Sequence, residues 1–332
     1  MSSPLLNLRL PDPIVIPALP LTGLYVCMLG TDYILLRYQR TVSKTQLRVA
    51  ITTAHALVPL VVASPSSPAN VAFATVPWFV ASYSAGLPLD TFSVKEWTRA
   101  IFETVIDRSP VEGNVYVQGL VKTGRGILKL LILVYGVQPL LPSRPDLMLR
   151  YPWFSKTSLI HTFLFGLDAY LIMGFLDMAA GVVQVMTGLK MEDMFDSPFL
   201  ATSRRWNKHI RNLLHAQIFS KAKEKKEKKK PKGFLSTVQG RGLLSFTASA
   251  IFHELIVWSV CRRVTLENLC FFSLHGLVCA IEVKYFKKQP QSRLGQCVGI
   301  MGQLSFMVMT GRLFLGPYLR HRFMEPLPLT RF

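Results

Sequence analysis

The chain has 332 residues, of which half are hydrophobic and only 17% are charged. Soluble domains carry about a quarter of their residues as charged side chains, so this composition favours a polytopic membrane protein. A formal net charge of +19 would suit nucleic acid, but eight lysines lie in one tract, 221–232, and most other basic residues flank apolar segments. Basic residues placed in this way set membrane topology, so we expect no nucleic-acid partner.

Eight segments approach the ~20 apolar residues that a helix needs to cross a bilayer. They are 19–36, 47–63, 71–89, 127–141, 158–185, 235–260, 266–286 and 296–319. The proline-broken start of the chain does not resemble a cleavable signal peptide, so the first segment is expected to act as the insertion signal. The fifth is long enough to tilt, or to cover one span and part of another. The sequence therefore predicts an all-α, polytopic transmembrane bundle of about eight spans.

The loops between these segments give an orientation. Basic residues gather after the first, third, fifth and seventh segments, which the positive-inside rule assigns to the cytosol. Both termini would then face the lumen. In the third loop, "VKEWTRAIFETVIDR" has the periodicity of an amphipathic helix that lies on a surface.

The stretch "SRRWNKHIRNLLHAQIF" predicts a second amphipathic helix, over 204–219, with Ser203 as a suitable N-cap. One face is apolar and the other is basic, which is the pattern of a helix lying in the membrane interface. Its basic face carries Arg204, Arg205, Lys208, Arg211 and His215. Asn207 lies between the two faces, next to Trp206. The basic loop that follows, 221–232, is expected to be solvated, to attract anionic lipid, or to gather a polyanionic ligand.

Chemistry-bearing residues are scarce inside the apolar segments. His253 in "SFTASAIFHELIVWSV" is the strongest candidate, with Glu254 beside it as a secondary one, because ionisable groups at membrane depth normally face a cavity or a partner. His275 and Asp168 are secondary candidates, for which internal packing is the simpler interpretation.

Several motifs are missing from the sequence, and this narrows the chemistry. It has no HExxH zinc motif, no GxSxG elbow, no P-loop and no CxxC pair among its five cysteines, so we expect no metal. A histidine without a nucleophile beside it suits general-base activation of a substrate hydroxyl.

Four blocks, in this order, resemble the wax synthase branch of the membrane-bound O-acyltransferase (MBOAT) superfamily. They are "FDSPFLATS…RRWN", "SFTASAIFHEL", "FFSLHGLVCAIEV" and "GQLSFMVMTGRLFLGPYLR". The resemblance covers roughly 158–320. It implies an N-terminal transmembrane region, 1–157, of about four spans and a catalytic region, 158–332. One departure is that "FLATS" runs directly into "RRWN", about six residues short of the family pattern, through a gene-model artefact, a divergence or an inactivating loss.

The resemblance implies a transferase that moves an acyl group from acyl-CoA to the hydroxyl of a lipophilic alcohol in the endoplasmic reticulum membrane. It places the family's histidine on His253, as the base, and its asparagine on Asn207, which would orient or polarise the reacting groups. We further expect acyl-CoA to bind along the basic helix. The residues for this role are Arg204, Arg205, Trp206, Lys208 and Arg211. Acyl-CoA would be a co-substrate, and no cofactor is expected.

The acceptor alcohol stays open. A long-chain alcohol, which would make the product a wax ester, is the first expectation. A sterol acceptor, or a terpenoid acceptor with acetyl-CoA, is the alternative within the same chemistry. Two other classes also remain: a lipid-handling membrane protein without catalysis, and a membrane-anchored interaction protein that uses the lysine tract.

Overall fold

The computed structural model describes residues 4–39, 41–88, 91–110, 113–193, 237–285 and 292–321. The predicted helix 204–219 and loop 221–232 lie outside these residues. This part of the chain holds ten α-helices and four two-residue strands. The helices are α1 (Ala18–Tyr38), α2 (Lys44–Val61), α3 (Ser67–Gly86), α4 (Val94–Phe102), α5 (Val115–Leu131), α6 (Lys156–Ile172), α7 (Gly174–Thr187), α10 (Val238–Cys261), α11 (Glu267–Tyr285) and α12 (Arg293–Arg320). The predicted all-α class is confirmed.

Four helical stretches are long and apolar enough to cross a membrane, and they indicate a multi-pass membrane protein. They are Ala18–Tyr38, Lys156–Thr187, Gln239–Cys261 and Arg293–Arg320. Each coincides with a predicted span. The other four predicted segments fall on α2, α3, α5 and α11, which are helical but do not reach that combination of length and hydropathy. The count of eight spans therefore stays a prediction.

The structure gives more detail on two predicted elements. The predicted surface helix is α4, which begins with a capping box between Ser93 and Glu96 and has no buried residue. The long fifth segment is two helices, because α6 ends at Ile172 and α7 begins at Gly174, with Met173 as the single residue between them.

The chain divides into two compact units. The N-terminal unit comprises Leu5–Val105 and Ile251–Leu266, and the main unit comprises Met1–Pro4, Ile106–Ala250 and Glu267–Phe332. Helix α10 contributes to both. The predicted division of the chain at residue 157 concerns functional regions and stays a prediction.

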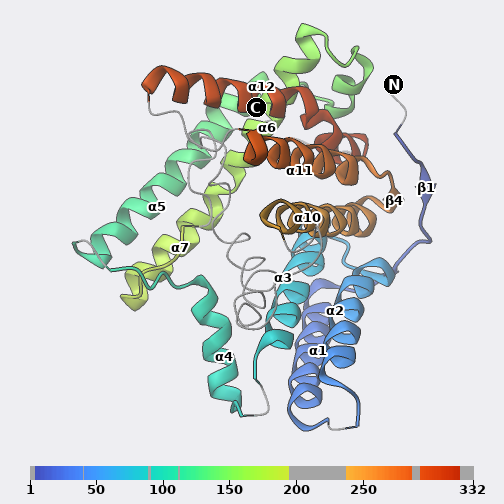
Figure 1. The fold of residues 1–332 in the computed structure, drawn as a ribbon, viewed down its shortest axis with the longest axis vertical. Helices are drawn as coiled ribbons and strands as arrows, with labels where there is room; N and C mark the ends of the chain where they lie inside the picture. The colour runs from blue at the N-terminus through green and yellow to red at the C-terminus, as the bar shows by residue number, and fades with distance from the viewer. Residues whose placement is uncertain are drawn as a thin grey trace. The chain divides into compact units, whose positions relative to one another are not determined.

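In the N-terminal unit, α1, α2 and α3 lie side by side (Figure 1). Helix α4 is joined to α3 because the Nε1–H of Trp97 donates to Ser84 Oγ at 2.8 Å. Two small sheets bind the connecting segments. Strand β1 (Leu8–Arg9) pairs antiparallel with β4 (Arg263–Val264), and β2 (Ile14–Val15) pairs parallel with β3 (Val62–Ala63).

In the main unit, α5 and α7 form the most extensive helix pair (Figure 1). The two backbones touch, because a Cβ atom added at Gly126 would lie 2.5 Å from the Met178 nitrogen and 2.6 Å from the Gly174 carbonyl oxygen. Close approach of this kind at glycines is a common way for helices to associate in membranes. A separate apolar core of this unit joins α6 to α12. Its buried residues are Met148, Leu149, Phe165, Leu315 and Leu319.

Candidate functional site

His253 and Glu254 lie in the part of α10 that belongs to the N-terminal unit. The surrounding sequence is apolar or small, with no proline, so the helix continues through both residues. Glu254 is only 2% exposed, and Trp258 donates its Nε1–H to Glu254 Oε2 at 2.9 Å. Glu254 and Trp258 are one helical turn apart, which is the spacing at which side chains of a helix meet. His253 itself is half-buried.

Beside these residues the N-terminal unit has a narrow crevice between α2, α3 and α10. The Phe252 ring packs against Trp78, with their centroids 4.7 Å apart. The crevice is lined by Ala56, Pro59, Ala74, Trp78, Phe252 and Leu255, and its accessible volume is about 10 Å³. That volume holds about one water, whereas sites for drug-sized ligands measure roughly 300–1,000 Å³. An acyl chain would need these helices to separate.

His275 on α11 has close neighbours on α11 and α12. Its Nε2 lies 3.1 Å from Thr310 Oγ1, and Thr310 donates its own hydrogen to the carbonyl oxygen of Phe306 at 2.8 Å. Because the hydroxyl has one hydrogen, His275 must be the donor to it. The imidazole also packs against the rings of Phe271 and Phe306, with centroids 4.2 and 4.7 Å away. This packing favours the structural interpretation that the sequence left open.

Asp168 on α6 is also buried, at 8% exposure, and its hydrogen-bonding neighbour is the buried side chain of Gln138. A buried amide is a common partner for a carboxyl group that must be kept out of water. Asp168 and His275 therefore each have a separate structural neighbour in the main unit.

Asn207 and the five expected acyl-CoA-binding residues (Arg204, Arg205, Trp206, Lys208 and Arg211) lie outside the described part of the chain. Within the described ranges, no group of three or more His, Cys, Asp or Glu side chains is arranged to hold a metal ion.

The main unit also contains a charged cluster that joins α5 to α7 and to the segment after α7. Lys129 Nζ lies 2.6 Å from Asp177 Oδ2, and Arg125 lies 2.7 Å from Asp193 Oδ1. Burial by itself would raise the pKa of Asp193, but the Arg125 hydrogen bond and the charges of Lys122 and Arg125 outweigh it and lower that pKa. These cations are paired with carboxylates and hold the two helices in register.

Sequence reasoning did not single out a further polar group in the N-terminal unit. His55 on α2 is fully buried, and its Nε2 lies 2.6 Å from Oδ2 of Asp32 on α1. The signal was available, because both residues fall inside predicted spans, where ionisable side chains are rare and normally paired.

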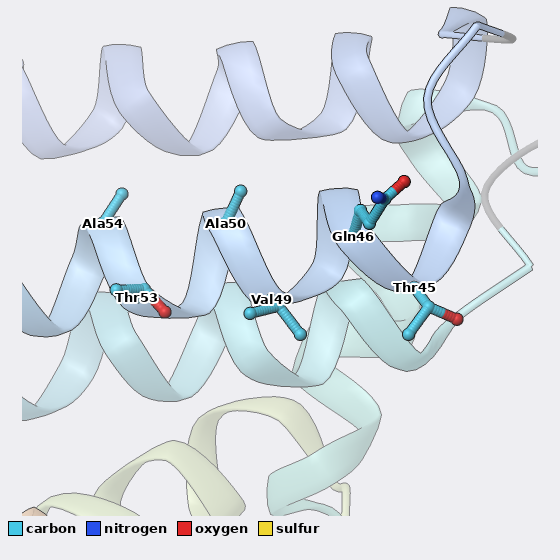
Figure 2. A pocket seen from close by; sticks show the side chains of 6 residues that line it. All are labelled: Thr45, Gln46, Val49, Ala50, Thr53 and Ala54. Carbon is cyan, nitrogen blue, oxygen red and sulfur yellow. The ribbon is translucent and has the colours of Figure 1, made fainter.

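The opposite face of α2 carries a shallow open hollow (Figure 2). It has a volume of about 620 Å³ and is lined by Thr45, Gln46, Val49, Ala50, Thr53 and Ala54. These residues recur every three or four positions, so they share one exposed face of the helix. Three of these residues are polar, but none has a titratable side chain, so the hollow offers no group for acid–base catalysis.

The candidate spans indicate a multi-pass helical membrane protein, and several of its apolar helices carry buried ionisable side chains. No family model matches the chain. The chain is distantly homologous to plant long-chain-alcohol O-fatty-acyltransferases, the wax synthases, at 25–31% identity over about half of its length.

Three relatives illustrate this homology. The Probable long-chain-alcohol O-fatty-acyltransferase 1 of Arabidopsis thaliana is 31% identical over 154 residues, 43% of this chain and 44% of that protein. The long-chain-alcohol O-fatty-acyltransferase of Simmondsia chinensis is 29% identical, over 43% of each chain. Acyl-CoA–sterol O-acyltransferase 1 of Arabidopsis thaliana is 26% identical, over 44% of each. The chain thus spans about half the length of the curated relatives that it matches.

Proposed function

We propose that this protein is an acyl-CoA-dependent O-acyltransferase that esterifies a lipophilic alcohol within the membrane, in the endoplasmic reticulum. The observation that carries the proposal is the homology to enzymes named as O-acyltransferases of long-chain alcohols and sterols. Further support comes from His253 and Glu254, an ionisable pair on an apolar helix. Such residues inside a membrane segment are costly and are therefore good candidates for a functional site.

His253 is the proposed general base. The oxygen of the alcohol attacks the thioester carbonyl, and the hydroxyl proton passes to the imidazole. Collapse of the intermediate breaks the carbon–sulfur bond, and the imidazolium returns the proton to the departing thiolate of coenzyme A. Imidazole suits both transfers because it exchanges protons near neutral pH.

Other residues would support this step. Glu254 is proposed as a positioning residue, because Trp258 holds its carboxylate in one orientation. Asn207 is proposed to orient or polarise the reacting groups as the donor to the developing oxyanion. The cations of the predicted helix 204–219 would bind the phosphates of the acyl-CoA, which Arg and Lys side chains do through charge-assisted hydrogen bonds.

A long-chain alcohol is the acceptor that we propose first, because several relatives carry that substrate in their names. A sterol is the second candidate, supported by the sterol O-acyltransferase among the relatives. Transfer of an acetyl group from acetyl-CoA to a terpenoid alcohol is a third candidate reaction, and the assay below also detects it.

The test uses microsomes from a host that lacks neutral-lipid synthesis. Wild-type protein and His253→Ala would each receive labelled acetyl-CoA or palmitoyl-CoA with a fatty alcohol, a sterol or a terpenoid alcohol. His321→Ala is a matched control, because His321 is an exposed histidine beyond the end of α12. We expect a labelled ester from the wild type and the control, and none from His253→Ala.

Two results would contradict the proposal. Ester formation by an inserted His253→Ala protein would remove the role of this residue. The absence of every ester with the inserted wild type, and again after the family's residues are restored before Arg204, would favour a lipid-handling protein without catalysis.

A further inference from the structure

A polar cluster lies inside the N-terminal unit, between α1, α2 and α3. The His55 side chain is fully buried and its Nε2 is 2.6 Å from Asp32 Oδ2, while Asp32 is 8% exposed. Tyr25, two turns before Asp32 on the same face of α1, is 3% exposed. Its ring stacks on His55 at a centroid distance of 6.4 Å and on Phe73 at 5.4 Å.

The contact with Asp32 decides how the His55 imidazole is used. A carboxylate accepts hydrogen bonds, so Nε2 carries the hydrogen and donates it. In the neutral ring Nδ1 then presents a lone pair. Nδ1 is buried and has no hydrogen-bond partner among the described residues, and the same holds for the hydroxyl oxygen of Tyr25. One unused acceptor and one unused donor therefore belong to two stacked side chains.

Each of the helices α2 and α3 also contains a proline. Pro59 lies four residues after His55 in α2, and Pro77 lies four residues after Phe73 in α3. Proline has no N–H, so neither can donate the helical hydrogen bond to the carbonyl of His55 or of Phe73. Within α2 and α3, the residues whose rings stack on Tyr25 are thus those whose carbonyls lose their usual helical donors. In a bilayer, freed groups of this kind are satisfied by neighbouring side chains or by ordered water.

We propose that this cluster is a binding site for one hydroxyl group, supplied by a water molecule or by a lipophilic alcohol. The ligand oxygen accepts a hydrogen bond from the Tyr25 hydroxyl, and the ligand hydroxyl donates to His55 Nδ1. Asp32 is a positioning residue, because its hydrogen bond to Nε2 selects the neutral tautomer in which Nδ1 is the acceptor. This hydroxyl-binding site does not depend on acyl transfer. Only the idea that the bound hydroxyl belongs to an alcohol rests on the proposed function.

The competing interpretation is that Asp32 and His55 merely join α1 to α2. The two interpretations differ in the sign of one substitution. An unpaired buried hydroxyl destabilises a protein, so its removal would leave stability unchanged or raise it. A hydroxyl that binds a ligand contributes a hydrogen bond, and its removal lowers stability.

The experiment measures the thermal unfolding midpoint of the full chain in lipid nanodiscs for Tyr25→Phe. Tyr33→Phe is a matched control on the same helix, because the Tyr33 hydroxyl donates to the Phe92 carbonyl oxygen at 2.9 Å and accepts from Arg37. We expect both substitutions to lower the midpoint by similar amounts. A Tyr25→Phe midpoint equal to or above that of the wild type would overturn the proposal.

A second variant tests the other hydrogen bond of the proposed site, from the bound hydroxyl to His55 Nδ1. In His55→Gln the amide nitrogen can still donate to Asp32, but the ring acceptor Nδ1 is removed. Because both substitutions remove the same bound hydroxyl, Tyr25→Phe and His55→Gln together should lower the midpoint less than the sum of the two single shifts. Purely additive shifts would contradict the proposal.

The source of the hydroxyl follows from the same samples with and without a long-chain alcohol. An alcohol-dependent rise of the midpoint in the wild type that is lost in both variants identifies an alcohol site, since a ligand of the folded state stabilises it. Equal midpoints with and without alcohol, together with the non-additive shifts, identify a water site. Neither result depends on ester formation, so this site and the proposed function can fail separately.

Discussion

The contact between α5 and α7 makes a sharp prediction at Gly126. Substitution by alanine would place a methyl group 2.5 Å from the Met178 nitrogen and 2.6 Å from the Gly174 carbonyl oxygen. Both neighbours are backbone atoms of α7, so they cannot rotate away as a side chain would. We therefore expect Gly126→Ala to force the two helices apart.

Two effects of opposite sign set how much Gly126→Ala changes the free energy of unfolding. Alanine favours a helix over glycine by about 1 kcal/mol, while overpacking of a close contact costs about 1–3 kcal/mol. Gly124 separates the two effects, because it lies on the same helix with nothing within 4 Å of an added Cβ. Gly124→Ala should stabilise the protein, and the difference between the two variants should equal the packing cost alone, about 1–3 kcal/mol.

The assay is the free energy of unfolding from an SDS titration of the protein in mixed micelles. Each variant is compared with the wild type under identical lipid and detergent conditions. If Gly126→Ala is as stable as Gly124→Ala, the α5–α7 backbones do not touch in the folded protein and this reasoning is wrong.

Two further predictions concern ion pairs of the main unit. Lys129→Met should cost about 3–5 kcal/mol in the same SDS titration, because it leaves the carboxylate of Asp177 buried without its nearest cation; recovery of much of this loss in Lys129→Met/Asp177→Leu would support that cause. Burial alone would raise the pKa of Asp107, but hydrogen bonds from Lys190 and Ser109 outweigh it and lower the pKa from 3.8 to about 2. Because the pKa of Asp107 is lower in the folded state than in the unfolded chain, the ionised carboxylate stabilises the fold at pH values above the unfolded pKa. This stabilisation is lost as the pH falls from about 4 to about 2. Lys190→Met should shift that loss to higher pH. The measurement is amide hydrogen exchange at Asp107, whose N–H donates to the Lys190 carbonyl oxygen. An unchanged pH profile of exchange would argue against the ion pair.

Much of the fold is predictable because apolar runs of bilayer length are a strong local signal. Four predicted spans coincide with helices that are long and apolar enough to cross a membrane, and α4 forms where its amphipathic pattern predicts it. The break at Met173 between α6 and α7 was not predictable from hydropathy. Both sides are equally apolar, and the break is visible only where α7 begins its close contact with α5.

The candidate site divides in the same way. His253 and Glu254 can be selected from sequence, because an ionisable pair inside an apolar helix is rare. The packing of His275 against Phe271 and Phe306 is not visible in the sequence, since it depends on which helices meet. The same is true of the link between Asp32 and His55, which are 23 residues apart.

The sequence by itself determined the helical class, the membrane setting and the acyltransferase resemblance. These follow from composition, the length of apolar runs and short motifs, which are properties of neighbouring residues. Only the tertiary structure decided which buried polar groups have partners, and it left His55 Nδ1 and the Tyr25 hydroxyl without one among the described residues. The physical reason is that hydrogen bonds between helices depend on the rotation and separation of whole helices, which hydropathy does not encode.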